Sequence, residues 1–165
     1  MEHACAWHLP PDPRIAQRSR ALTRSALFGM EVTAEDIDAA ELGVCELATN
    51  AFQHAQPPYG LRIWCAGPIA MVEVFDSTAH LPALPCTHSP DDNTTGTELD
   101  LLQEHGRGLA LVSHLSQGRC GADRLSSGKL TWFSVARDGV HQPHSSPDLF
   151  AFAPTYTQLA ITPAL

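Results

Sequence analysis

The sequence predicts an α+β fold, a two-layer sandwich in which helices cover one face of a mixed, mostly antiparallel sheet. Two long segments near the N-terminus carry apolar residues at helical spacing. Later segments rich in β-branched and aromatic residues come in pairs joined by tight turns. The resulting order of helix, helix, hairpin, loop, helix and hairpin is typical of an α+β sandwich rather than of alternating parallel βαβ units.

The N-terminal part predicts a short strand and a first helix. Residues 4–9 (ACAWHL) are expected to form an edge strand that ends at Pro10-Pro11. Residues 13–29 are expected to form a helix with Pro13 at its start and Gly29 at its end, which is the usual asymmetry of helix ends.

A second, longer helix is predicted from about Thr33 to Ala55. Thr33 is a suitable N-cap, and Asp36 stands three residues later, as in a capping box with a shorter acid. Pro57-Pro58 then ends the helix. The apolar stripe of this helix consists of Ile37, Val44, Leu47, Ala48 and Ala51.

The rest of the chain predicts two hairpins on either side of a long loop and a short helix. Strands are expected at 60–66 and 69–76 around Gly67-Pro68, and at 119–124 and 129–136 around Ser126-Ser127-Gly128. The loop 77–105 is long enough to be functional, and a glycine-led helix is expected at 106–115. We expect one domain over 1–137 with a lid at 77–105, and a flexible tail over 138–165.

Composition narrows the classes of function. The chain has 165 residues and a formal net charge of -8, so nucleic acid is a poor candidate for a direct partner. It has no apolar run of membrane-spanning length and no secretory start, and its five cysteines show no CxxC pair. These features indicate a cytoplasmic protein.

Three polar residues recur every four positions in the second helix: Glu46, Asn50 and His54. This spacing places a carboxylate, an amide and an imidazole on one helix face, beside the apolar stripe. A solvated polar face would show the same spacing, so the pattern alone leaves both interpretations open.

Two further features suit a nucleotide. Asp76 ends an apolar strand, where a carboxylate can accept a hydrogen bond from a ligand amine, although a turn-initiating Asp would look the same. Gly106-Arg107-Gly108 precedes a helical segment; glycines allow close backbone approach, and helix N-termini favour phosphate. Ordinary glycines at a helix entry would also fit.

Taken together, these motifs resemble the GHKL ATPases, and more closely the short bacterial regulators of the anti-sigma-factor serine kinase type. The resemblance covers about residues 10–137. The matching motifs are ELATNAFQHA with Glu46, Asn50 and His54, VEVFDSTAHLP with Asp76, and EHGRGLALV with Gly106, Arg107, Gly108 and Leu109.

The resemblance implies a Bergerat-type ATP-binding fold that binds ATP or ADP with Mg²⁺. It implies that Asn50 holds the metal and that Glu46 is the general base or orients water. It further implies that Asp76 reads the adenine amino group and that His54 lies near the ribose or phosphate edge. The backbone of Gly106, Arg107, Gly108 and Leu109 would cradle the phosphates.

Two departures from the family pattern stand out. The family usually has glycines after its Asp, whereas Ser77, Thr78 and Ala79 follow Asp76 here. The family also places a Thr directly after Gly-Lys in the last strand, whereas Leu130 separates Lys129 from Thr131. A shift of one residue turns a strand side chain to the other face, so the sequence leaves open whether Thr131 or Leu130 faces the nucleotide.

The resemblance implies two functions. The first is a serine/threonine-protein kinase that sequesters a sigma factor and phosphorylates a small anti-sigma-factor antagonist. The alternative is a nucleotide-binding regulator without kinase activity. Relatives often form dimers, so the resemblance also implies a homodimer. The sequence does not identify which sigma factor or antagonist would bind.

Overall fold

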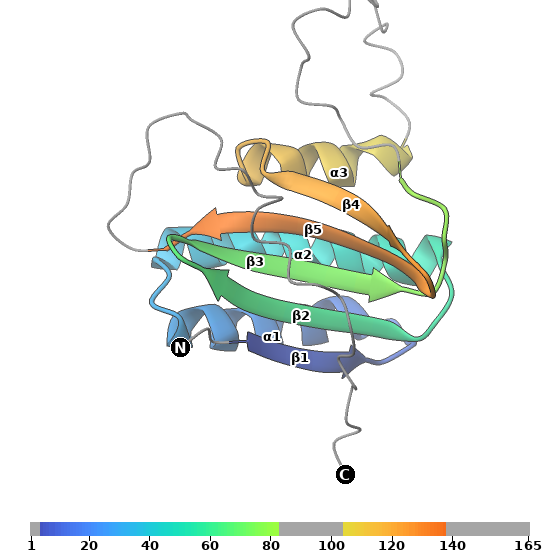
Figure 1. Cartoon of the computed structure of the whole chain (residues 1–165), viewed down its shortest axis with the longest axis horizontal. Helices are drawn as coiled ribbons and strands as arrows, with labels where there is room; N and C mark the ends of the chain where they lie inside the picture. Colours follow the sequence, from blue (N-terminus) through green and yellow to red (C-terminus); the bar gives the residue numbers. More distant parts are fainter. Residues whose placement is uncertain (1–3, 83–103, 138–165) are drawn as a thin grey trace, which may run out of the picture.

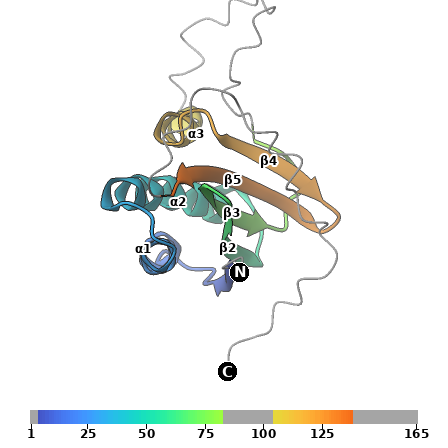
Figure 2. The same cartoon turned by 60° about the vertical axis from the view of Figure 1, so that its left-hand side comes forward.

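The computed structural model describes residues 4–82 and 104–137. Within them, three helices pack on one face of a five-stranded sheet, which confirms the predicted α+β sandwich. Figure 1 shows the sheet in front of the helices, and Figure 2 shows the two layers nearly edge-on. The predicted tail and most of the predicted lid lie outside the described residues.

The sheet is antiparallel at every pairing between described strands, in the order β1-β2-β3-β5-β4. Its last strand in sequence therefore lies inside the sheet, beside β3. The strands are β1 (Ala4–Leu9), β2 (Tyr59–Ala66), β3 (Ile69–Asp76), β4 (Cys120–Leu125) and β5 (Gly128–Ala136).

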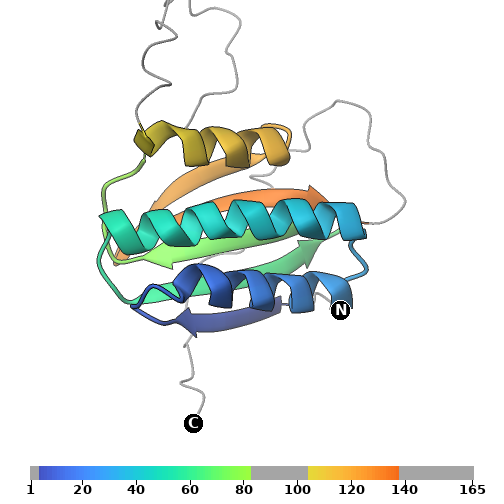
Figure 3. The same ribbon diagram turned by 180° about the vertical axis from the view of Figure 1, so that it is seen from behind.

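Figure 3, seen from behind, shows the three helices side by side, with α2 in the middle. They are α1 (Ile15–Gly29), α2 (Ala34–His54) and α3 (Glu104–Leu115). None of the helices in the described ranges is both long enough and apolar enough to cross a membrane.

Local chemistry sets the start of α2 as the sequence predicts. The hydroxyl of Thr33 accepts a hydrogen bond from the backbone N–H of Asp36 at 3.1 Å. The capping box is altered, since the Asp36 carboxylate accepts from the Thr33 hydroxyl at 2.8 Å.

Two helices begin elsewhere than the sequence suggests. α1 begins at Ile15, so Pro13 precedes the helix, and the Asp12 carboxylate accepts from the backbone N–H of Arg14 at 2.8 Å. α3 begins at Glu104, two residues before the predicted start, so Gly106 and Gly108 lie inside its first turns.

The core lies between α2 and the sheet face that carries alternate residues of each strand. Leu61, Ile63, Val72 and Val74 are each no more than 2% exposed and face the helices. On α2 the buried positions are mostly small, which lets the helix sit close to the sheet. They are Ile37, Ala40, Gly43, Val44, Leu47, Ala48 and Ala51.

Gly43 lets α2 pack closely against β5. A Cβ at Gly43 would lie 2.9 Å from Cζ of Phe133, whose own side chain is 2% exposed and has little room to move. We therefore expect Gly43→Ala to destabilise the fold by about 1 to 2 kcal/mol, because overpacking outweighs the gain in helix propensity.

Gly29→Ala is the matched control, because a Cβ there would meet no atom within 4 Å. We expect this change to be neutral or stabilising by about 0.5 kcal/mol. Urea unfolding of both variants measures the two effects. Equal midpoints for Gly43→Ala and the wild type would contradict the proposed contact with Phe133.

Candidate nucleotide site

The polar face of α2, which carries the three predicted residues, lies beside α3. Glu46 and Asn50 are half-buried and His54 is exposed, near the end of the helix. The buried stripe of α2 fixes the rotation of the helix about its axis, and this rotation sets the direction of the polar face. The predicted placement of Glu46, Asn50 and His54 on one face therefore holds in the structure.

Gly108 of α3 lies directly against two of these residues. A Cβ at Gly108 would be 2.5 Å from Glu46 Oε2 and 3.6 Å from Asn50 Nδ2. Any larger residue at this position would displace the Glu46 carboxylate. The structure thus brings together two motifs that are more than 50 residues apart in the sequence.

The other residues of the predicted glycine motif divide into two groups. Gly106 and Arg107 lie in the first turn of α3 rather than in an entry loop. Leu109 is 5% exposed and belongs to the hydrophobic core, and as the sixth residue of α3 it lies beyond the first four N–H groups that lack helical partners.

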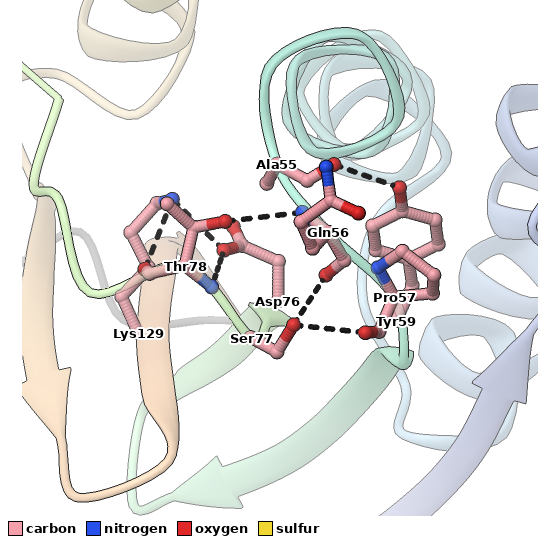
Figure 4. Close-up of polar contacts among 8 residues, drawn as sticks. All are labelled: Ala55, Gln56, Pro57, Tyr59, Asp76, Ser77, Thr78 and Lys129. Carbon is pink, nitrogen blue, oxygen red and sulfur yellow. Dashed lines mark hydrogen bonds and ion pairs between the residues drawn. The ribbon is translucent and has the colours of Figure 1, made fainter.

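Asp76 forms the polar centre at the end of β3 (Figure 4). Its Oδ1 accepts hydrogen bonds from the backbone N–H of Thr78 at 2.8 Å and from Nζ of Lys129 at 2.9 Å. Asp76 is 2% exposed and Lys129 is 8% exposed, so the ion pair is buried. The sequence alone does not pair Lys129 with Asp76.

The cross-strand register explains this pair. Lys129 lies directly opposite Asp76 in the antiparallel β3–β5 ladder, and opposite residues place their side chains on the same face. Gly128 has a φ of +153°, and a Cβ there would collide with the carbonyl oxygen of Asp76. Only glycine fits this position, which brings the following lysine to the strand end.

The segment after Asp76 is tied to the end of α2. The Ser77 hydroxyl donates to the backbone oxygens of Gln56 and Pro57, both at 2.8 Å (Figure 4). The Thr78 hydroxyl accepts from the backbone N–H of Gln56 at 3.0 Å. Ser77 and Thr78 thus join the end of β3 to the segment that follows α2, and they hold Asp76 near the helix end.

Tyr59 completes this region from β2. Its phenol donates to the Ala55 carbonyl oxygen at 3.1 Å, and its ring meets Phe52 edge-on. Burial, and then the negative charge of Asp76, raise the pKa of the Tyr59 phenol above 10.0. The neutral phenol therefore remains a hydrogen-bond donor at the helix end.

The register of β5 also decides between Thr131 and Leu130. Thr131 lies opposite Val74, two residues from Lys129, and so shares the helix-facing side with Asp76. Leu130 lies opposite Phe75 and points to the other face. The ladder runs from Lys129 to Ala136 without a bulge, so Thr131 reaches this side through regular alternation.

The residues present suit a nucleotide with a hard cation. Asn50 and Glu46 carry oxygen donors of the kind that Mg²⁺ prefers, next to a helix turn without side-chain bulk at Gly108. The Asp76 carboxylate offers an acceptor for an amino group.

Sequence reasoning missed four residues of this region: Lys129, Tyr59, Ser77 and Gln56. The Gly-Lys pair was visible in the sequence, but its partner follows from a β3–β5 pairing between strands that are not neighbours in the chain.

Comparison with known proteins shows which family the chain matches. Residues 9–126 match the family model described as the histidine kinase-like ATPase domain. Among curated proteins, none matches the chain.

Two solved structures align with the chain, and the first of them has a similar fold. The RsbU and RsbW domains of Rv1364c from Mycobacterium tuberculosis align with a TM-score of 0.56 at 16% identity, over 82% of this chain and 34% of that one. The chain thus spans about a third of that protein's structure. The histidine kinase domain of the Erythrobacter litoralis EL346 blue-light activated histidine kinase aligns with a TM-score of 0.43 at 20% identity, over 74% of this chain and 58% of that one.

The raised pKa of Tyr59 makes a prediction about stability. Because the folded state favours the neutral phenol, its contribution is fully present below the ordinary pKa of about 10 and is lost as pH rises through the higher folded value. Tyr59→Phe should cost about 1 kcal/mol at pH 8, mostly through the lost bond to Ala55, and less near pH 11.

Urea unfolding of both proteins at the two pH values measures this difference. A Tyr156→Phe background leaves Tyr59 as the only tyrosine, so its absorbance titration reports the pKa directly. A midpoint at or below 10 would contradict the burial of the phenol beside Asp76.

Proposed function

Because the chain belongs to the histidine kinase-like ATPase domain family, we propose that it binds ATP with Mg²⁺ and acts as a cytoplasmic regulator of the anti-sigma-factor type. The observation that carries this proposal is the approach of Gly108 to Glu46 and Asn50, at the same end of the molecule as Asp76. In this proposal, the general base, the metal ligand and the phosphate contacts come from the neighbouring helices α2 and α3.

In this proposal, Asp76 accepts a hydrogen bond from the adenine amino group. The network from Ser77 and Thr78 to Gln56 holds the carboxylate in place before the nucleotide arrives. A preorganised acceptor avoids the ordering cost of a mobile one, which favours binding. His54, one turn from Asn50, lies toward the ribose or phosphate edge.

The phosphates would lie between α2 and the N-terminal turns of α3. The first N–H groups of α3 lack helical partners and carry the positive end of the helix dipole, so they favour anionic oxygens. The missing side chains at Gly106 and Gly108 leave this backbone accessible, and Arg107 adds a positive charge to the segment. When bound, Mg²⁺ would neutralise phosphate charge, with Asn50 as its protein ligand.

Glu46 is the proposed catalytic residue. Its carboxylate lies one helical turn from Asn50 and against the α3 backbone, where it would orient and deprotonate a hydroxyl nucleophile. Phosphoryl transfer needs mainly positioning and charge stabilisation, which the α3 backbone and Asn50 with its Mg²⁺ would supply beside this carboxylate.

The proposed reaction is transfer of the γ-phosphoryl group to a Ser or Thr of a small anti-sigma-factor antagonist. A sigma factor would be the sequestered partner, and a homodimer the proposed assembly. The alternative is a nucleotide-binding regulator without transfer activity. Thr131 lies on the side of Asp76, so the extra residue after Gly-Lys does not turn this threonine away from the proposed nucleotide site.

The site assignment predicts different results at Asn50 and Glu46. Asn50→Ala should abolish binding of ATP with Mg²⁺, because it removes the metal ligand. Glu46→Gln keeps the shape of the side chain beside Gly108, so binding should remain while transfer is lost. Titration calorimetry measures binding, and a radiolabelled γ-phosphate assay against candidate antagonists measures transfer.

Unchanged ATP affinity in Asn50→Ala would contradict the assignment of Asn50 to the metal site. Wild-type binding without any transfer would instead support the regulator without kinase activity. A control independent of transfer is thermal unfolding, since a ligand at 100 times its Kd should add about 2.7 kcal/mol to stability.

Gly108 provides a test that separates the site from the fold. Gly108→Ala should keep or raise stability, because alanine favours a helix by about 0.5 to 1 kcal/mol over glycine and the Glu46 carboxylate can move. ATP affinity should fall about tenfold, equivalent to about 1.4 kcal/mol.

The control is Gly29→Ala, which adds the same methyl group in open space. Both variants are compared by calorimetry and thermal unfolding. If Gly108→Ala and Gly29→Ala bound ATP equally well, the phosphate assignment for the start of α3 would be wrong.

A further inference from the structure

The proposed function gives a role to Asp76 but none to Lys129, its partner in a buried ion pair. The Lys129 side chain is 10% exposed and that of Asp76 is 3% exposed, and Nζ lies 2.9 Å from Oδ1. A buried ion pair contributes little net stability compared with an apolar pair of similar volume. The fold accounts for the lysine as the charge partner of the buried carboxylate, but not for the donor that this ammonium leaves unused.

The pair leaves one carboxylate oxygen available to a ligand. Oδ1 of Asp76 already accepts from Lys129 and from Thr78. Among the described residues, no hydrogen bond reaches Oδ2. A carboxylate oxygen has about two acceptor positions, so Oδ1 is filled and Oδ2 remains as the acceptor.

The ammonium group of Lys129 likewise keeps one N–H donor available. Nζ donates to Oδ1 at 2.9 Å and makes a longer contact of 3.4 Å with the Thr78 carbonyl oxygen. An ammonium carries three N–H groups, so one is left without a partner in the part of the chain described here. An acceptor and a cationic donor thus lie side by side at the end of β3.

We propose that Lys129 is a specificity-determining residue that lets the site accept purines with a six-carbonyl group as well as adenine. The proposal rests on the proposed function, in which Asp76 faces the base. The adenine amino group would donate to Oδ2. In hypoxanthine, the ring N1–H would donate to Oδ2, and the six-carbonyl oxygen would accept from Nζ of Lys129.

A carboxylate without the lysine would behave differently. It would place one acceptor against another when a six-carbonyl purine binds, and sites with such unpaired groups reject the wrong ligand by about 10⁴-fold. The neighbouring ammonium converts this repulsion into a hydrogen bond. Lys129 therefore controls discrimination between bases more than affinity for ATP.

The test compares ATP with inosine triphosphate, which differs only at the base edge that Asp76 and Lys129 would read. Titration calorimetry in Mg²⁺ with the full chain should give the wild type affinities within about tenfold of each other. Lys129→Met should raise the preference for ATP by at least about a hundredfold, and Lys129→Arg should keep the wild-type ratio because it retains a cationic donor.

Rejection of inosine triphosphate by more than about a thousandfold in the wild type would overturn the proposal. So would a Lys129→Met variant that loses affinity for both nucleotides by the same factor, since that pattern indicates a purely structural role. If Lys129→Met does not fold, the wild-type and Lys129→Arg ratios still decide. Absence of any nucleotide binding to the wild type would refute the proposed function as well.

Discussion

The packing of α2 against the sheet is the interaction on which the rest of the structure depends. Its buried stripe is built mainly of small residues, and Gly43 brings the helix axis close to Phe133 on β5. Close packing allows few rotations of a helix about its axis, because each rotation would expose apolar residues or create clashes. The orientation of Glu46 and Asn50 is therefore a consequence of the core and needs no contact of its own.

The end of α2 in turn fixes the position of the end of β3. The bonds from Ser77 and Thr78 to Gln56 and Pro57 add a polar link between the ends of two elements that already pack on each other in the core. Asp76 is consequently held between the end of a packed helix and a strand inside the sheet. Backbone groups make much of this connection, so the segment reaches a defined position without the glycines that the family pattern has there.

Charge at the site is balanced locally. A buried carboxylate without a partner would cost several kcal/mol, and the ammonium of Lys129 supplies the partner from the neighbouring strand. The same arrangement leaves the second carboxylate oxygen as an acceptor. The pair thus combines a requirement of burial with the presentation of polar groups at one edge of the sheet.

The sequence by itself determined the features that depend on local patterns. The N-cap Thr33, the hairpin around Gly67 and the four-residue spacing of Glu46, Asn50 and His54 follow from neighbours in the chain, and the structure has them where they were expected. The start of α3 was two residues off, because glycines inside a helix look like glycines before it.

Only the tertiary structure decided which distant residues meet. Lys129 pairs with Asp76 and Thr131 shares its face because β5 lies beside β3, although α3 and β4 come between them in the sequence. Likewise, the contact of Gly108 with Glu46 depends on how α3 packs beside α2. Side-chain spacing reports faces within one element, whereas register and helix packing between elements arise from burial of the whole core.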